Sequence, residues 1–263
     1  MSTFTRGLLD RKSIIVIGAD EIGAGIARRF AREGARIAVL DEDLGRAQAV
    51  ATASSGDGAD AFAVSADYRS IRAAVHSATS RLGGVYALMN NLLPMPALGA
   101  FEEQTAAMFE EALARVQVAA CAMQAVMPFM RDAGEGRIVN VGHRYGEGVS
   151  EGLAAYNAAA WSLVGITRSA ALDWGRYQIA TNLLLPLADT PELARAHARR
   201  PNIIKMMLAQ LPLQRAGDCV EDVGGAALFL VSDAANFING EVVHADGGQH
   251  VAGPVLNPIK FPD

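Results

Sequence analysis

The spacing of hydrophobic positions changes along the chain, with segments typical of strands followed by segments typical of helices. The run SIIVIG at residues 13–18 is almost entirely apolar and ends in glycine, as a strand buried on both faces does. The next segment, 22–35, has helical spacing, and Gly34 ends it. The same alternation predicts strands at 36–43, 60–67, 86–91, 137–142, 178–186 and 242–248, and helices at 43–53, 69–82, 105–131, 153–175, 190–208 and 220–232.

This order of elements indicates an α/β fold. Alternating strands and helices with short connections imply right-handed crossovers and a parallel sheet covered by helices on both faces. We therefore expect a single Rossmann-type, doubly wound parallel sheet. The length of 263 residues suits one domain spanning 1–263. Three prolines predict an irregular C-terminal tail at about 251–263.

Charge and composition narrow the class of protein. A net charge of −5 gives no electrostatic reason to bind nucleic acid or an anionic membrane. The most apolar long stretch, 116–130, is short and contains two glutamines, which predicts a buried helix and no membrane span. Without an apolar signal segment at the start, we expect a soluble, cytoplasmic protein. Cys121 and Cys219 have no metal-ligand or redox spacing, so we expect no metal site and reduced thiols.

The first strand-to-helix turn is the place where glycines let a pyrophosphate approach a helix N-terminus. Here Gly18 and Gly23 frame that turn, and Asp41 ends the second strand about 20 residues later. A carboxylate at that position accepts hydrogen bonds from an adenosine ribose and repels a 2′-phosphate, which favours NAD over NADP. An equally good interpretation makes Asp41 the N-cap of the following helix.

With these residues in place, the chain from about 10 to 250 resembles the classical short-chain dehydrogenase/reductase (SDR) family. The segments that carry the resemblance include SAD around Asp67, LMNN with Asn90, GRIVNV and YNAAAWSLVGITRSAALDW, in the family's order. The resemblance implies an NAD-binding oxidoreductase with cofactor contacts from Gly18, Gly23, Asp41, Asp67 and Asn90. It also implies a dimer or tetramer built on helices 105–131 and 153–175, whose small apolar residues independently suggest burial in a subunit interface.

The catalytic tetrad of the family is Asn–Ser–Tyr–Lys, and here the resemblance implies that only Tyr156 is retained. The lysine position is Ala160, and His143 stands thirteen residues before the tyrosine, where the serine belongs. The asparagine falls on Arg115, or on Val116 if the gap is placed differently. Because an unassisted phenol has a pKa near 10, its lone hydroxyl is a poor base at neutral pH. The chain is thus expected to be a degenerate member of the family.

The cofactor positions depart from the family pattern as well. Asp20 and Glu21 put carboxylates beside the helix N-terminus that should meet a pyrophosphate. Acidic groups there satisfy the helix dipole themselves, so we expect one of them to be an N-cap that repels phosphate. The family's Asn-Asn-Ala-Gly becomes Asn-Asn-Leu-Leu, and Leu92 and Leu93 add side chains where a backbone lies against the cofactor.

Three functional hypotheses follow. The one we favour is a non-catalytic or very weakly active subunit that supports an oligomeric NAD-dependent dehydrogenase or ketoreductase, with an SDR sister subunit as partner. The second is an active NAD(H)-dependent enzyme with a rewired acid/base, using Tyr156 with His143 or Arg144. The third is a non-redox enzyme that uses the vacated cofactor groove as a substrate pocket and needs no cofactor.

The substrate is not specified by the sequence. The resemblance makes 187–212 a substrate lid, and this segment carries Met206 and Met207 near Arg195 and Arg199. Such a mixture suits an apolar ligand with an anionic group, such as an acyl-CoA. A helix with one apolar and one solvated face explains the same residues equally well.

Overall fold

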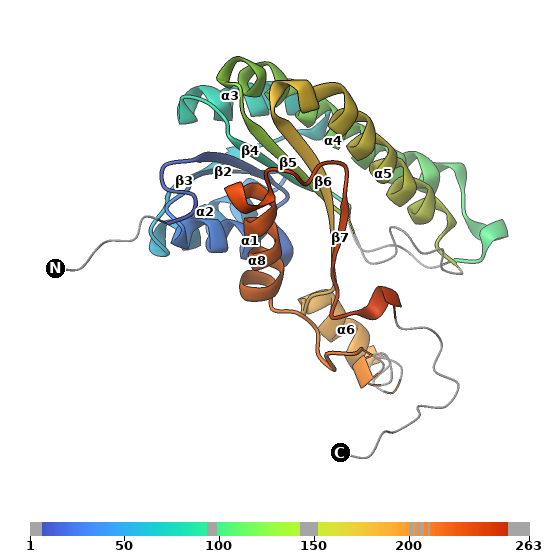
Figure 1. Cartoon of the computed structure of the whole chain (residues 1–263). Coiled ribbons are helices and arrows are strands. Elements are labelled where there is room, and N and C mark those ends of the chain that lie inside the picture. Colours follow the sequence, from blue (N-terminus) through green and yellow to red (C-terminus); the bar gives the residue numbers. More distant parts are fainter. Residues whose placement is uncertain are drawn as a thin grey trace.

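Seven parallel strands form one sheet in the order β3-β2-β1-β4-β5-β6-β7. The computed structural model (Figure 1) describes residues 7–93, 99–142, 152–199 and 211–251, with Asn202, Lys205, Leu208 and Ala209. The strands are β1 Ser13–Ile17, β2 Arg36–Asp41, β3 Asp60–Ser65, β4 Ala87–Asn91, β5 Gly136–Val141, β6 Ile179–Pro186 and β7 Val242–Ala245. The helices are α1 Glu21–Arg32, α2 Leu44–Gly56, α3 Ile71–Leu82, α4 Ala106–Ala133, α5 Ala154–Trp174, α6 Pro191–Arg199 and α8 Gly224–Val231.

Helices cover both faces of the sheet, so the expected doubly wound α/β fold is confirmed. Figure 1 shows α3, α4 and α5 on one face and α1, α2 and α8 on the other. Residues of β1 alternate between the two layers: Ile15 and Ile17 pack in the first, and Ile14 and Val16 in the second. Because both faces are buried, the strand needs apolar side chains at every position, which is why its sequence reads as a continuous apolar run.

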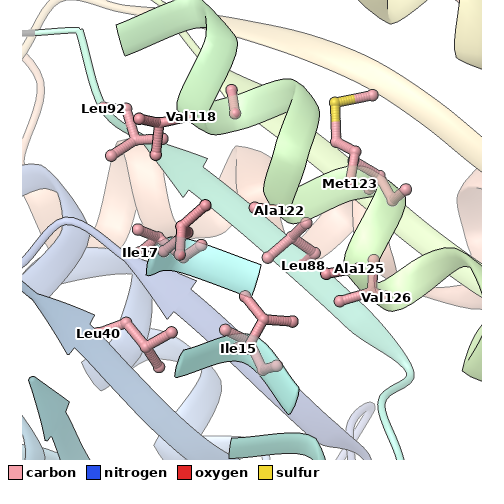
Figure 2. Packing of buried hydrophobic residues seen from close by; sticks show 14 of the residues in the cluster. Ile15, Ile17, Leu40, Leu88, Leu92, Val118, Ala122, Met123, Ala125 and Val126 are labelled. Atoms are coloured by element: carbon pink, nitrogen blue, oxygen red, sulfur yellow. The ribbon is translucent and has the colours of Figure 1, made fainter. Parts of the chain in front are cut away.

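Helix α4 runs along the sheet in the first layer. In Figure 2, Leu88 of β4 lies beside Ala122 of α4, and Leu92 lies beside Val118. The helix is long and apolar enough to cross a membrane by length and composition alone. Most of its apolar residues from Val116 onward instead belong to the large core cluster, and α3 and α5 flank the helix. A core helix of this kind has the same composition as a membrane span.

Most expected elements begin and end within two or three residues of the observed ones. The helix expected at 190–208 is described as α6 over 191–199, and only scattered residues beyond it are described. The helix expected at 220–232 begins with one π-helical turn, η5 Cys219–Val223, and continues as α8. The tail expected to be irregular at 251–263 lies outside the described residues except for Val251.

The η5 turn packs against α1 and is held by an ion pair. Arg215 donates two hydrogen bonds to the carboxylate of Asp222, at 2.5 and 2.9 Å, and the Asp218 backbone N–H donates a third at 2.6 Å. The hydrogen bond from Arg215 is the main reason why the pKa of Asp222 is lowered from 3.8 to about 2.

The dependence of thermal stability on pH should reveal the contribution of the Arg215–Asp222 ion pair. The folded pKa of Asp222 lies below its unfolded value, so the pair contributes stability above about pH 4 that is lost as pH falls toward 2. We expect Asp222→Asn to melt below the wild type at pH 7, with the difference in Tm shrinking between pH 4 and pH 2. Glu102→Gln, which removes an exposed carboxylate from 101–103, controls for net charge. A Tm difference independent of pH would contradict the assignment.

Candidate functional site

The crevice of a doubly wound sheet opens where the strand order reverses, which here is between β1 and β4. Gly18 directly follows β1 at this point with φ of +94°, and a Cβ there would lie 1.9 Å from the backbone oxygen of Asn91. Gly23 is packed as closely, since its Cβ would lie 1.9 Å from the Gly18 oxygen. Both expected cofactor glycines are therefore required by contacts within the chain itself.

Asp20 is the N-cap of α1, as one of the two acidic residues was expected to be. Its Oδ1 accepts hydrogen bonds from the backbone N–H groups of Ile22 and Gly23, both at 3.0 Å. The same oxygen accepts a bond from Nδ2 of Asn91 at 2.6 Å, which ties the β1 turn to the end of β4. Protein atoms displace water around the carboxyl group and raise the pKa of Asp20, and the charge of Glu21 adds to this effect.

Further acidic residues, which the sequence patterns did not single out, gather around the same helix N-terminus. Burial, together with the smaller effect of the nearby charges of Asp218, Asp20, Glu21 and Asp189, raises the pKa of the Cys219 thiol to about 12. Asp189 is brought there by the segment after β6, where its N–H donates to the Gly217 oxygen at 2.8 Å. In the sequence, the aspartate of the segment PLADT at 186–190 was the available signal for this position.

Asp41 is almost completely buried, with 2 % of its surface exposed. Its Oδ2 accepts a hydrogen bond from the Ala19 N–H at 2.7 Å. Its Oδ1 accepts from the Asp43 N–H and from the guanidinium of Arg46, both at 2.8 Å. The interpretation of Asp41 as a helix N-cap is wrong: Asp43 caps α2, since it immediately precedes Leu44 and its side chain accepts from the Arg46 N–H.

Asp67 and Asn90, the remaining expected cofactor residues, also have partners within the chain. Asp67 caps the short 3₁₀ turn that follows β3 by accepting from the Arg69 N–H at 2.9 Å. Asn90 is buried and donates to Asn140 at 2.9 Å, and Asn140 donates to Thr167 at 2.8 Å. This chain of amides joins β4, β5 and α5 within the core.

Tyr156 lies in a small apolar cluster on α5. Its ring and Ala160 are buried together with Leu153, and the partly buried Leu93 packs against them. Only 6 % of the Tyr156 surface is exposed. His143 and Arg144, the expected compensating groups, lie outside the described residues, as do Met206 and Met207 of the expected lid.

The two leucines after β4 have different positions. Leu92 was expected to face the cofactor, but it packs in the core between the sheet and α4 (Figure 2). Leu93 is partly buried and packs against both this core and the tyrosine cluster. At the expected asparagine position, Arg115 pairs with Glu42 at 3.3 Å.

The sheet order, the glycine turn at its switch point and the tyrosine on α5 define a Rossmann-type protein of the dehydrogenase class. The family model described as enoyl-(acyl carrier protein) reductase matches residues 18–250. The chain belongs to the classical short-chain dehydrogenase/reductase family of oxidoreductases. Dehydrogenases of this family typically use NAD or NADP.

Several characterised relatives are similar over nearly their whole length. Levodione reductase of Leifsonia aquatica is 30% identical over 266 residues, covering 95% of this chain and 98% of that protein. The 2-(S)-hydroxypropyl-CoM dehydrogenase 3 of Xanthobacter autotrophicus is 32% identical over 239 residues, covering 88% and 93%. The crystal structure of levodione reductase superposes with a TM-score of 0.87 at 26% identity, covering 93% of this chain and 100% of that one.

Proposed function

We propose that this chain is a non-catalytic, or very weakly active, family member that serves as a subunit of an oligomeric NAD-dependent alcohol dehydrogenase or ketoreductase. The cluster of Leu93, Tyr156 and Ala160 is the observation that carries this proposal. A phenol activates a substrate only if it reaches the reacting oxygen and its pKa is lowered. Here Ala160 stands at the lysine position of the family, and Leu93 packs against the cluster that contains the tyrosine.

The residues at the switch point do not fit a dinucleotide. A pyrophosphate binds to the free N–H groups of a helix N-terminus. In this chain the N–H groups of Ile22 and Gly23 already donate to Asp20, and Asn91 holds that carboxylate in place. A second anion at this position meets like charge from Asp20 and Glu21. The degenerate tetrad and the acidic turn thus support the same conclusion.

A partner subunit is supported by the surface of α4 and α5. Leu113 on α4 and Trp161 and Leu172 on α5 are large apolar side chains with 41%, 47% and 85% of their surface exposed. Exposed apolar groups of this size on adjacent helices are typical of a subunit interface. The occupant is either a second copy or a catalytic sister subunit, and an acyl-CoA is one candidate substrate for the assembly.

Co-purification from the native host tests the partnership. We expect mass spectrometry to identify a second SDR that carries the complete Asn–Ser–Tyr–Lys tetrad, in a fixed ratio to this chain. Trp161→Glu should reduce its recovery at least tenfold, because a charge is placed in an apolar contact. Leu8→Glu changes another exposed leucine and serves as the matched control. Recovery of this chain alone, as a homo-oligomer that turns over substrate, would refute the proposal.

The relatives and the retained Tyr156 favour one alternative, an active NAD(H)-dependent oxidoreductase that uses His143 or Arg144 as the compensating group. Calorimetric titration with NADH separates the two proposals. A catalytic protein binds NADH in the micromolar range, whereas a degenerate subunit gives no binding at millimolar concentration.

A further inference from the structure

A second recess lies between α3 and α4. It has a volume of about 560 Å³, which is within the range of small-molecule sites. The described residues that line it include none of the expected cofactor residues. They are Glu42, Arg69, Ser70, Ile71, Arg72, Ala73, Glu111, Ala114, Arg115, Gln117, Val118 and Cys121.

Positive and negative side chains do not balance in this recess. Arg115 is paired with Glu42 at 3.3 Å, so these two charges largely cancel. Arg72 donates to the neutral side-chain amide of Gln124, which leaves its positive charge uncompensated. Among the described residues, Arg69 has no ion pair either. Against these two arginines stands one further carboxylate, so the recess is positive within a chain of net charge −5.

The recess also has an apolar floor. Ile71 and Val118 are buried core residues that form part of its lining, and the half-buried Cys121 lies on the same helix as Val118. A ligand that used only the arginines would leave this floor exposed to water. A ligand with an anionic group and an apolar body covers both parts.

We propose that this recess binds a small organic acid, a carboxylate or a phosphate monoester. Arg69 and Arg72 bind the anionic group, since guanidinium groups make charge-assisted hydrogen bonds to both kinds of anion. The apolar body of the acid packs on Ile71 and Val118. The lining contains none of the residues assigned to the β1/β4 crevice, and competition with NADH tests whether the two sites are separate.

Cys121 provides a reporter within the recess. At pH 8 the thiol of Cys219, with its pKa raised to about 12, reacts little with alkylating reagents. The rate of iodoacetamide labelling at Cys121 is measured by peptide mass spectrometry at constant ionic strength. The probes are benzoate, phenyl phosphate, benzamide and inorganic phosphate, and NADH is added in a separate arm.

Benzoate or phenyl phosphate at saturation is expected to slow Cys121 labelling at least fivefold, and the better of the two identifies the preferred anion. Arg69→Ala and Arg72→Ala should each raise the half-protecting concentration at least tenfold. Arg131→Ala, at the other end of α4, should leave it unchanged. Equal protection by benzamide, by inorganic phosphate or by NADH would overturn the proposal. A Cys121 that does not react in the folded protein would also overturn it.

Discussion

Asp20→Asn combined with Leu93→Gly is expected to tighten NADH binding at least tenfold. Two unit charges 4 Å apart near a protein surface repel by about 4 kcal/mol, and a tenfold change in Kd requires about 1.4 kcal/mol. Asparagine caps helices as well as aspartate does, so the first substitution removes charge while the helix end stays capped. The second removes the side chain that packs against Tyr156 and Ala160.

Two comparisons sharpen this titration. Glu33→Gln removes a carboxylate from the C-terminal end of α1 and should leave NADH binding unchanged. Ala160→Lys alone should also leave NADH binding nearly unchanged, because Leu93 still packs against the tyrosine cluster. When Ala160→Lys and His143→Ser are both added to the double variant, we expect the first detectable turnover. Micromolar NADH affinity in the wild type would show that the crevice was open from the start, and no gain in the double variant would show that Asp20 and Leu93 do not close it.

The fold could be predicted from the sequence because its determinants are local and periodic. The apolar run of β1 and the helical spacing that ends at Gly34 each specify an element without reference to the rest of the chain. The capping role of the Asp20–Glu21 pair was also predictable, since a carboxylate before a helix meets free N–H groups wherever the helix lies. These predictions needed only neighbours in sequence.

The partners of the site residues were not predictable in the same way. Asp41 was expected to bind a ribose or to cap its own helix, and the sequence did not predict its hydrogen bonds with Ala19, Asp43 and Arg46. Leu92 and Leu93 are adjacent in sequence, yet Leu92 is buried in the core and only Leu93 also packs against the tyrosine cluster. Such differences depend on how α4 and α5 pack on the sheet, which periodicity does not specify.

The cavity between α3 and α4 is a second feature that sequence analysis missed. Its arginines come from 69–72 and from position 115, and these segments have no motif in common. Arg115 was noticed only as the replacement for an asparagine of the tetrad. The structure places it in the lining of this cavity, where it pairs with Glu42.

Gly18→Ala is expected to destabilise the protein by about 3 kcal/mol, which combines backbone strain with a steric clash. Alanine at φ +94° is strained, and its Cβ would stand 1.9 Å from the Asn91 oxygen. The turn would have to move, which threatens the hydrogen bond from Gly18 N–H to Leu40 at 2.8 Å. In a protein of this size we expect a decrease in Tm of about 10 °C, measured by calorimetry.

Gly225→Ala on α8 is the matched control, because a Cβ there meets no atom within 4 Å and alanine favours a helix. Its Tm should equal or slightly exceed that of the wild type. If Gly18→Ala melts within 2 °C of the wild type, a threshold of roughly 1 kcal/mol, the glycine is not needed for folding. If Gly18→Ala lowers the Tm strongly and the protein binds no NADH, contacts within the fold alone require a glycine at this turn. The glycine is then needed even in a family member that no longer binds the cofactor.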